Sequence, residues 1–295
     1  MNKKIVAVLG GSGFLGSHIV DQLDKEGYSV RILDIKACDF HKDKHEIFIA
    51  DILDRDALHE CIKGCDYVYN FAGIADIKEA SNNPIATIEK NTLGATYAMQ
   101  ESVDSKVKKF LYASSMYVYS SYGSFYRSSK QCAEEIISSY SEEYGIEYVM
   151  LRYGTLYGPR SQRWNSMRKY IYQLMSTGVV DYIGTGEEIR EYIHVKDAAC
   201  LSVKVLIINY VNCGLNITGS QVMHSIEMLK MIGEILNKDI KINLINDDPD
   251  HNHYVTTPYR YTPKPALKIS PSEFVDIGHG ILEMIEEMDK ERKNL

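Results

Sequence analysis

The stretch Gly10-Gly11-Ser12-Gly13-Phe14-Leu15-Gly16 follows a short apolar run, 5–9, and opens an amphipathic segment, 14–25. Glycines at this spacing, between a strand and a helix, are typical of a turn that binds the pyrophosphate of a dinucleotide. Glycine permits the tight turn and the close approach of backbone N–H groups, and the helix N-terminus adds its partial positive charge. The residues expected to hold the pyrophosphate are Gly10, Gly13, Phe14, Leu15 and Gly16.

Asp34 closes the second apolar run, 30–33, and lies 18 residues after Gly16. A carboxylate at this place accepts hydrogen bonds from the adenosine ribose and repels a 2′-phosphate, which favours NAD over NADP. Lys36 is a cation that a 2′-phosphate could use, so NADP stays open. The third and fourth runs also end at the carboxyl edge of the expected sheet, where open α/β sheets bind ligands. The further residues expected around the cofactor are Ile35, Lys36, Asp51, Ile52, Phe71, Ala72 and Gly73.

The first half of the chain alternates short apolar runs with longer amphipathic segments. Strands are predicted at 5–9, 30–33, 46–49, 67–70, 110–113 and 147–151, and helices at 14–25, 55–62, 84–103 and 126–144. Gly27, Gly64 and Gly145 follow three of these helices, where a left-handed residue is favoured. Strands joined by helices give right-handed crossovers and a parallel sheet covered on both faces. We therefore expect an α/β fold with a doubly wound parallel sheet of the Rossmann type.

From about Thr155 the pattern becomes less regular, and a second, smaller α/β unit is expected. Helices are predicted at 166–177, 197–208 and 225–236, strands at 193–195, 215–218 and 241–245, and a last helix after the proline-rich segment 258–271. We expect residues 1–155, together with about 192–213, to form the NAD-binding domain. Residues 156–191 and 214–295 are expected to form the substrate-binding domain.

Composition narrows the choice of partners. The chain of 295 residues has a net charge of −7, and its basic residues are not massed in tails, so no nucleic-acid partner is expected. No apolar stretch approaches the roughly 20 residues that span a bilayer, so no membrane segment is expected. The 6 cysteines are scattered without the spacing of a metal site, which favours buried free thiols, a reducing cytoplasm and no metal.

Tyr126 and Lys130 lie four residues apart on a predicted helix, so their side chains share one face. A free tyrosine has a pKa of about 10 and is a poor base at neutral pH. An ammonium group one turn away favours the phenolate, which can then take a proton from a substrate hydroxyl. Ser115 ends the fifth strand, and its hydroxyl can reach the same substrate oxygen. We expect Ser115, Tyr126 and Lys130 to form the catalytic group.

Together these motifs resemble the extended short-chain dehydrogenase/reductases, and most of all their NAD-dependent nucleotide-sugar epimerase/dehydratase family, which includes proteins similar to UDP-glucose 4-epimerase. The resemblance covers nearly the whole chain, because it continues through 151–160, 184–186 and 190–197. It implies NAD as cofactor and a nucleotide-diphosphate sugar as substrate. It also implies a homodimer formed by the helices predicted at 84–103 and 126–144.

The resemblance assigns roles to individual positions. It places Ser115 beside the substrate, makes Tyr126 the base, and lets Lys130 assist it while both also contact the cofactor. Tyr153 would lie near the nicotinamide, and Arg190 would bind the substrate diphosphate. The further substrate-side candidates are Asn165, Arg160 and Arg260.

Two departures from the family pattern bear on the activity. Where the 4,6-dehydratases of this family have an acidic pair after the catalytic hydroxyl residue, this chain has Met116 and Tyr117, which argues against a dehydratase. Tyr126 follows Ser115 by only 11 positions, whereas typical extended members have a longer loop there. Because that loop helps to shape the sugar pocket, the identity of the sugar is not carried over.

Three functions are compatible with these residues. The first is a nucleotide-sugar 4-epimerase, in which Tyr126 removes the C4 hydroxyl proton, NAD takes the C4 hydride, and the 4-keto sugar turns over before hydride returns to its other face. The alternative is an NAD-dependent C4 dehydrogenase or 4-keto reductase of a nucleotide sugar, which uses the same residues. The third is a cofactor-sensing protein without catalysis, and the presence of Tyr126 and Lys130 argues against it.

Overall fold

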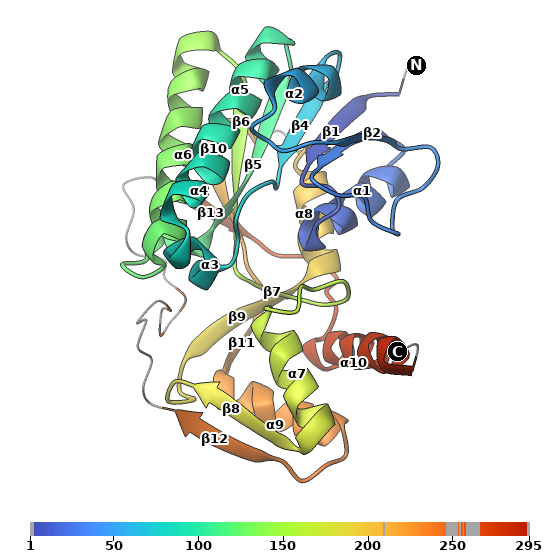
Figure 1. The fold of residues 1–295 in the computed structure, drawn as a ribbon, viewed down its shortest axis with the longest axis vertical. Coiled ribbons are helices and arrows are strands. Elements are labelled where there is room, and N and C mark those ends of the chain that lie inside the picture. The colour runs from blue at the N-terminus through green and yellow to red at the C-terminus, as the bar shows by residue number, and fades with distance from the viewer. Residues whose placement is uncertain are drawn as a thin grey trace.

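A sheet of eight parallel strands is the largest element of the computed structural model, which describes residues 3–208, 210–245, 253, 255, 257 and 266–293 (Figure 1). Its strands are β1 (Ile5–Leu9), β2 (Ser29–Asp34), β3 (Glu46–Ile49), β4 (Tyr67–Asn70), β5 (Lys109–Ser115), β6 (Glu147–Tyr153), β10 (Cys213–Ile217) and β13 (Ala266–Ile269). They lie in the order β3-β2-β1-β4-β5-β6-β10-β13. All six strands predicted in the first half of the chain are present in this sheet, and the predicted Rossmann-type fold is confirmed.

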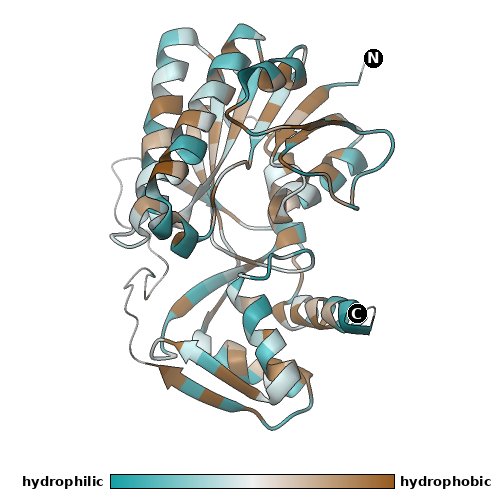
Figure 2. Cartoon of the chain, in the orientation of Figure 1, coloured by the Kyte–Doolittle hydropathy of each residue, from teal (hydrophilic) through white to brown (hydrophobic). Residues whose placement is uncertain are grey.

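Helices cover both faces of this sheet. One face carries α1 (Phe14–Lys25) and α8 (Val195–Lys204), and the other carries α2 (Arg55–Ile62), α5 (Gly94–Asp104) and α6 (Ser124–Tyr144). Successive residues of a central strand therefore enter different cores: Val8 packs on the α1 side and Ala7 on the α2 side, and both are fully buried. Figure 2 shows the result, with hydrophobic residues along the strands and hydrophilic residues on the outer helix surfaces.

The helix predicted at 84–103 is present in three parts. It consists of α4 (Pro84–Ile88), a π-helical turn (Glu89–Leu93) and α5, and it follows a short helix, α3 (Ile77–Asn82), that was not predicted. The helix-ending glycines are confirmed, because Gly27, Gly64 and Gly145 have φ angles of 84°, 77° and 74°.

The rest of the chain forms a smaller lobe below the sheet in Figure 1. Its strands are β7 (Thr155–Tyr157), β9 (Ile189–His194) and β11 (Gln221–His224) in one sheet and β8 (Val179–Ile183) and β12 (Lys241–Ile245) in another. Its helices are α7 (Ser166–Thr177), α9 (Ser225–Ile235) and α10 (Ile277–Lys293). A separate apolar core unites them, with Ile171, Leu229 and Ile281 fully buried.

Two strands of the large sheet, β10 and β13, come from a segment that was predicted to belong to the substrate-binding domain. β10 pairs with β6, and β13 pairs with β10, so residues 214–217 and 266–269 extend the large sheet and do not belong to the smaller lobe. Local periodicity can identify a strand, but the sheet that it joins depends on a partner far away in the chain. The remaining division into an NAD-binding and a substrate-binding domain stays a prediction.

Two further features bear on membrane association and on the cysteines. Within the described residues, no helix combines the length and the apolar character needed to cross a membrane. The six cysteines are all unpaired, as predicted, although only Cys61 and Cys65 are buried and Cys132 is exposed on α6.

Candidate active site

The glycine turn lies where the order of the strands reverses. β1 has β2 on one side and β4 on the other, and a crevice at such a switch point is where open α/β sheets bind ligands. Gly10 has a φ of 79°, and a Cβ there would lie 2.7 Å from the backbone N of Ala72, in the loop after β4. The loops after β1 and β4 therefore meet at this point, and only glycine fits between them.

The first turn of α1 offers free backbone donors. Gly13 is the N-cap and provides no capping side chain, so the N–H groups of the first turn stay available for an anion. A Cβ on Gly16 would lie 2.1 Å from the Gly10 carbonyl oxygen, so the turn closes tightly only with glycine there. Phe14 is buried and Leu15 packs against the core, which leaves their backbones for a ligand. This cradle fits the pyrophosphate of NAD.

Asp34 and the glycine turn are joined directly. The Ser12 N–H donates to Asp34 Oδ2 at 2.9 Å, and the Lys36 N–H donates to Oδ1 at 3.3 Å. The carboxylate therefore stands beside the turn at the end of β2, where an adenosine ribose would reach it. Ile35 is 65% exposed, so its side chain is also available to a ligand.

Asp51 and Ile52 follow β3, the strand beside β2, and their side chains lie in different environments. Asp51 forms a close ion pair with Lys90, and although burial alone would raise the pKa of Asp51, this pairing lowers it. Ile52 is buried against Gly94, where a Cβ would lie 2.7 Å from its side chain. Lys90 was not predicted as a site residue.

Asn91 is a buried residue near the cofactor site that sequence reasoning missed. Its side chain accepts from the Ile74 N–H at 2.7 Å and donates to the Ile74 carbonyl at 2.9 Å and to Ser129 Oγ at 3.0 Å. A Cβ on Gly73 would lie 2.3 Å from its Oδ1, so the predicted Phe71-Ala72-Gly73 loop is fixed by Asn91. Its place in a π-helical turn, a feature frequent at functional sites, is not visible in the sequence.

The predicted catalytic residues come from two adjacent elements. Ser115 ends β5, where its Oγ accepts the Tyr117 N–H at 3.3 Å, while Tyr126 and Lys130 lie on the first turns of α6. Lys130 Nζ donates to the Ala113 carbonyl at 2.8 Å and lies 5.9 Å from the centre of the Tyr126 ring. Burial lowers the pKa of Lys130 to about 8, against a smaller opposing effect of Glu134.

A buried ion pair supports this corner of the site. Glu134, one helical turn after Lys130, binds the Arg152 guanidinium at 2.9 and 2.5 Å and accepts the Ser114 hydroxyl at 2.5 Å. Arg152 also donates to Tyr119 Oη at 2.7 Å. Since Ser114 directly precedes Ser115, the network fixes the end of β5 relative to α6.

The short interval between Ser115 and Tyr126 folds back onto α6. Its first part, Met116–Tyr119, is a 3₁₀ turn, and Gln131 donates to the Val118 carbonyl at 2.9 Å. The Tyr117 ring meets the Tyr126 ring edge-on, with centroids 6.0 Å apart, and its hydroxyl lies 2.7 Å from His253 Nδ1. Tyr117 therefore lies directly beside the predicted base, Tyr126.

Tyr153 lies next to Ser115 in the sheet, and its side chain packs in the core on the α1 and α8 side. The two residues are register partners on β6 and β5. The Tyr153 ring packs near Phe71, at 6.4 Å between centroids, and its hydroxyl lies 2.7 Å from Ser202 Oγ on α8. Its side chain is therefore part of the core, and its predicted contact with the nicotinamide stays a prediction.

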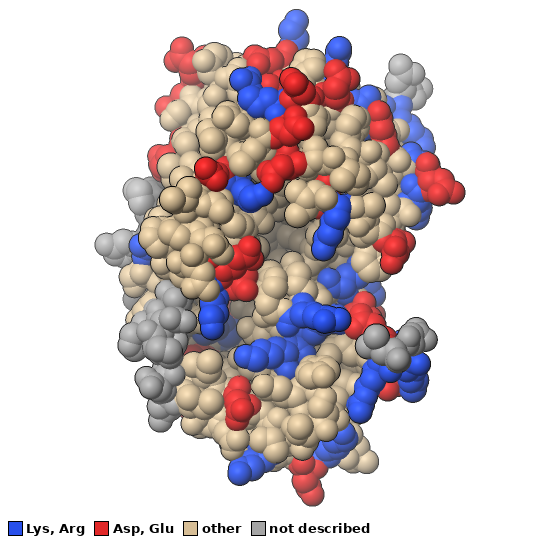
Figure 3. All heavy atoms as spheres, viewed as in Figure 1, with Lys and Arg blue, Asp and Glu red and all other residues tan. Residues whose placement is uncertain are grey.

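The predicted substrate-side residues are dispersed. Asn165 caps α7 by accepting the Arg168 N–H at 3.3 Å. Arg160 pairs with Asp21 of α1 at 2.8 Å, and Arg190 donates to the Val255 carbonyl at 3.0 Å. Arg260 lies outside the described residues. Figure 3 shows the molecule hollowed between its two lobes, with Lys and Arg side chains on both sides of the hollow.

A Rossmann-type sheet, an open helix N-terminus at its switch point and a Ser-Tyr-Lys group at the neighbouring strand end define a dinucleotide-dependent enzyme. Residues 6–209 match the NAD dependent epimerase/dehydratase family, and the chain belongs to this family.

Named relatives agree with this assignment. A protein of Methanocaldococcus jannaschii, provisionally named UDP-glucose 4-epimerase, is 30% identical over 240 residues, which are 74% of this chain and 78% of that protein. The UDP-N-acetyl-alpha-D-glucosaminuronate decarboxylase of Bacillus cytotoxicus is 28% identical over 66% of this chain and 69% of its own length. The fold matches the UDP-N-acetylglucosamine 4-epimerase of Methanobrevibacter ruminantium with a TM-score of 0.85, at 23% identity, over 99% and 100% of the two chains.

Proposed function

We propose that the protein is an NAD-dependent nucleotide-sugar 4-epimerase that acts through a 4-keto intermediate. The observation that carries this proposal is the position of Lys130, which is buried beside the Tyr126 ring on the helix next to Ser115. The substrate class rests on the names of the relatives, several of which act on UDP-linked sugars.

Each group of site residues has its own role in this reaction. The N–H groups of the first turn of α1 would bind the pyrophosphate, and Asp34 would bind the adenosine ribose. NAD, when bound, supplies a hydride acceptor that later returns the hydride. Lys130 favours the phenolate of Tyr126, which takes the C4 hydroxyl proton and later gives it back, while Ser115 orients the same oxygen.

The residues after Ser115 favour epimerisation over elimination of water. Met116 is fully buried and carries no proton to transfer, and the Tyr117 hydroxyl is engaged with His253. An NAD-dependent C4 dehydrogenase or 4-keto reductase remains the alternative, since it needs the same Ser115, Tyr126 and Lys130.

The test is to incubate the purified protein with a panel of UDP-, dTDP-, GDP- and CDP-sugars and to follow products by NMR. We expect C4 epimers to form without added NAD or NADH. Formation of products only with stoichiometric cofactor would establish the dehydrogenase or reductase instead. Tyr126→Phe should lower the rate by about 10²–10⁴-fold. Tyr144→Phe, an exposed tyrosine on the same helix, should leave it unchanged.

The same proposal includes a homodimer, a cytoplasmic location and a role in carbohydrate biosynthesis. Ile85 and Ile88 of α4 and Phe125 of α6 support the dimer, because they are 75%, 41% and 43% exposed. Light scattering should give twice the chain mass, and Ile88→Glu should shift it to the monomer. A monomeric wild-type protein would exclude the dimer.

A further inference from the structure

The connection between β2 and β3 has an unusual form. Parallel neighbouring strands need a crossover of about a dozen residues, and usually a helix fills it. Here residues 35–45, the β2–β3 connector, cross without any helix or strand. The connector begins directly after Asp34, the residue expected to bind the adenosine ribose, so its position decides whether that end of the cofactor site is open.

Side chains fix the connector to the NAD-binding lobe at two points. His41 Nε2 lies 2.9 Å from Ser12 Oγ in the glycine turn. Asp24 of α1, whose side chain is 5% exposed, pairs with Lys42 at 2.9 Å and Lys44 at 2.7 Å. Both lysines are therefore directed to Asp24 and anchor the connector to α1.

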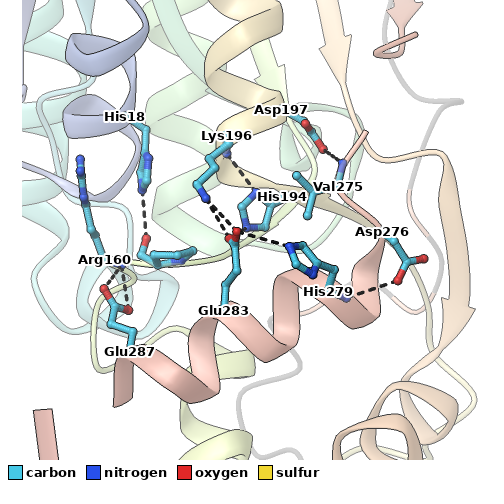
Figure 4. Close-up of polar contacts among 11 residues, drawn as sticks. His18, Arg160, His194, Lys196, Asp197, Val275, Asp276, His279, Glu283 and Glu287 are labelled. Carbon is cyan, nitrogen blue, oxygen red and sulfur yellow. Dashed lines mark hydrogen bonds and ion pairs between the residues drawn. The ribbon is translucent and has the colours of Figure 1, made fainter. Parts of the chain in front are cut away.

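A third anchor comes from the smaller lobe. The Arg160 guanidinium lies 4.1 Å from the centre of the Phe40 ring and pairs with Asp21. The Arg160 backbone N–H donates to the Glu287 carboxylate of α10 at 3.0 and 3.1 Å (Figure 4). Arg160 has a φ of 65°, in the left-handed region that is uncommon for non-glycine residues. Arg160 therefore links the connector, α1 and α10.

We propose that the β2–β3 connector is a latch over the adenosine end of the NAD site, closed by His41 on the glycine turn and by Arg160 from the smaller lobe. It sets how fast NAD leaves. His41, Phe40 and Arg160 are positioning residues in this scheme, since they act through the connector. The inference rests on the NAD site at the glycine turn and is independent of which sugar is converted.

The experiment measures exchange of bound NAD. Protein purified with NAD is diluted into excess isotopically labelled NAD, and the labelled fraction is followed by mass spectrometry. Phe40→Leu, which removes the ring that faces Arg160, and Arg160→Ala should each speed exchange about three- to tenfold, because such contacts act mainly on the dissociation rate. His41→Ala should act in the same direction.

Lys196→Ala is the matched control. Lys196 Nζ pairs with Glu283 of α10 at 2.9 Å, so it contacts the same helix through a carboxylate other than Glu287. It should leave exchange unchanged. Wild-type exchange rates in Phe40→Leu and Arg160→Ala, at unchanged melting temperature, would overturn the latch, as would equal acceleration by Lys196→Ala. A protein that retains NAD but has no epimerase activity would refute the proposed function and leave this test intact.

Discussion

Glu134 and Arg152 form an ion pair that is buried directly behind the end of β5, with Nη2 and Oε2 2.5 Å apart. The two residues are 5% and 2% exposed. A charge pair so far from water is a weak net source of stability, but each partner requires the other. The pair matters here because Ser114 and Tyr119 bond to it on either side of Ser115.

Glu134→Gln should destabilise the protein strongly, because it leaves the Arg152 guanidinium buried without a counter-charge. We expect a loss of about 3–5 kcal/mol in the free energy of unfolding, measured by urea titration. Asp289→Asn breaks the exposed pair with Lys293 and should cost less than about 1 kcal/mol. Equal losses in the two variants would contradict the role of burial.

Gly16→Ala should abolish tight NAD binding, because the new Cβ would lie 2.1 Å from the Gly10 carbonyl oxygen and force the turn open. Titration calorimetry should show NAD affinity lowered by at least about tenfold, or roughly 1.4 kcal/mol. Gly27→Ala is the control: its φ of 84° is unsuited to alanine, but no atom lies within 4 Å of the new Cβ. It should lower stability and leave NAD affinity unchanged.

The turnover rate should fall as the pH rises above about 8. Burial lowers the pKa of Lys130 to about 8, so the ammonium that favours the Tyr126 phenolate is present below this pH and is lost above it. The check is to measure kcat at saturating substrate at pH values from below about 8 to about 10. In Lys130→Arg the guanidinium stays charged, and any residual activity should show no such decline. A wild-type rate that stays level up to about pH 10 would refute this.

The protein should lose stability between pH 6.5 and about 4 because of His18. Burial lowers the pKa of His18 from 6.5 to about 4, so the unfolded chain binds more protons in this window and stability falls as the pH falls. The maximum loss from this residue is about 3 kcal/mol. His18→Gln, which can still donate to the Pro159 carbonyl, should flatten the decline in melting temperature. An unchanged slope in His18→Gln would assign the decline to other groups.

The sequence predicts the first half of the fold well, because its signals are local. The bounds of α1, α2, β3 and β4 agree with the structure to the residue, since glycine turns and apolar runs mark them directly. The short strands β7 and β11 were missed, because they lie outside the regular alternation of strands and helices that marks β3 and β4, and they pair with β9 in a separate small sheet.

Local signals also decide how much of the site could be predicted. The glycine turn and the Tyr126–Lys130 pair are recognisable from spacing alone. Asn91 and Glu134 act through residues distant in the chain, so no local pattern reveals them. Arg160 was expected on the substrate side, yet it bonds to Asp21 and Glu287, because a motif identifies a position without specifying its partner.

Tyr119 ends the 3₁₀ turn after Ser115, accepts a bond from Arg152 and donates to Asn216 on β10 at 2.8 Å. The Tyr119 hydroxyl thus connects the segment between Ser115 and Tyr126 to two strands of the large sheet, β6 and β10. Grafting a longer loop from another member of the family would remove that connection, so Arg152 Nη1 and Asn216 Oδ1 would each lose a buried hydrogen bond. A chimaera designed to accept new sugars therefore has to keep Tyr119, and insertions are best placed between it and Gly123.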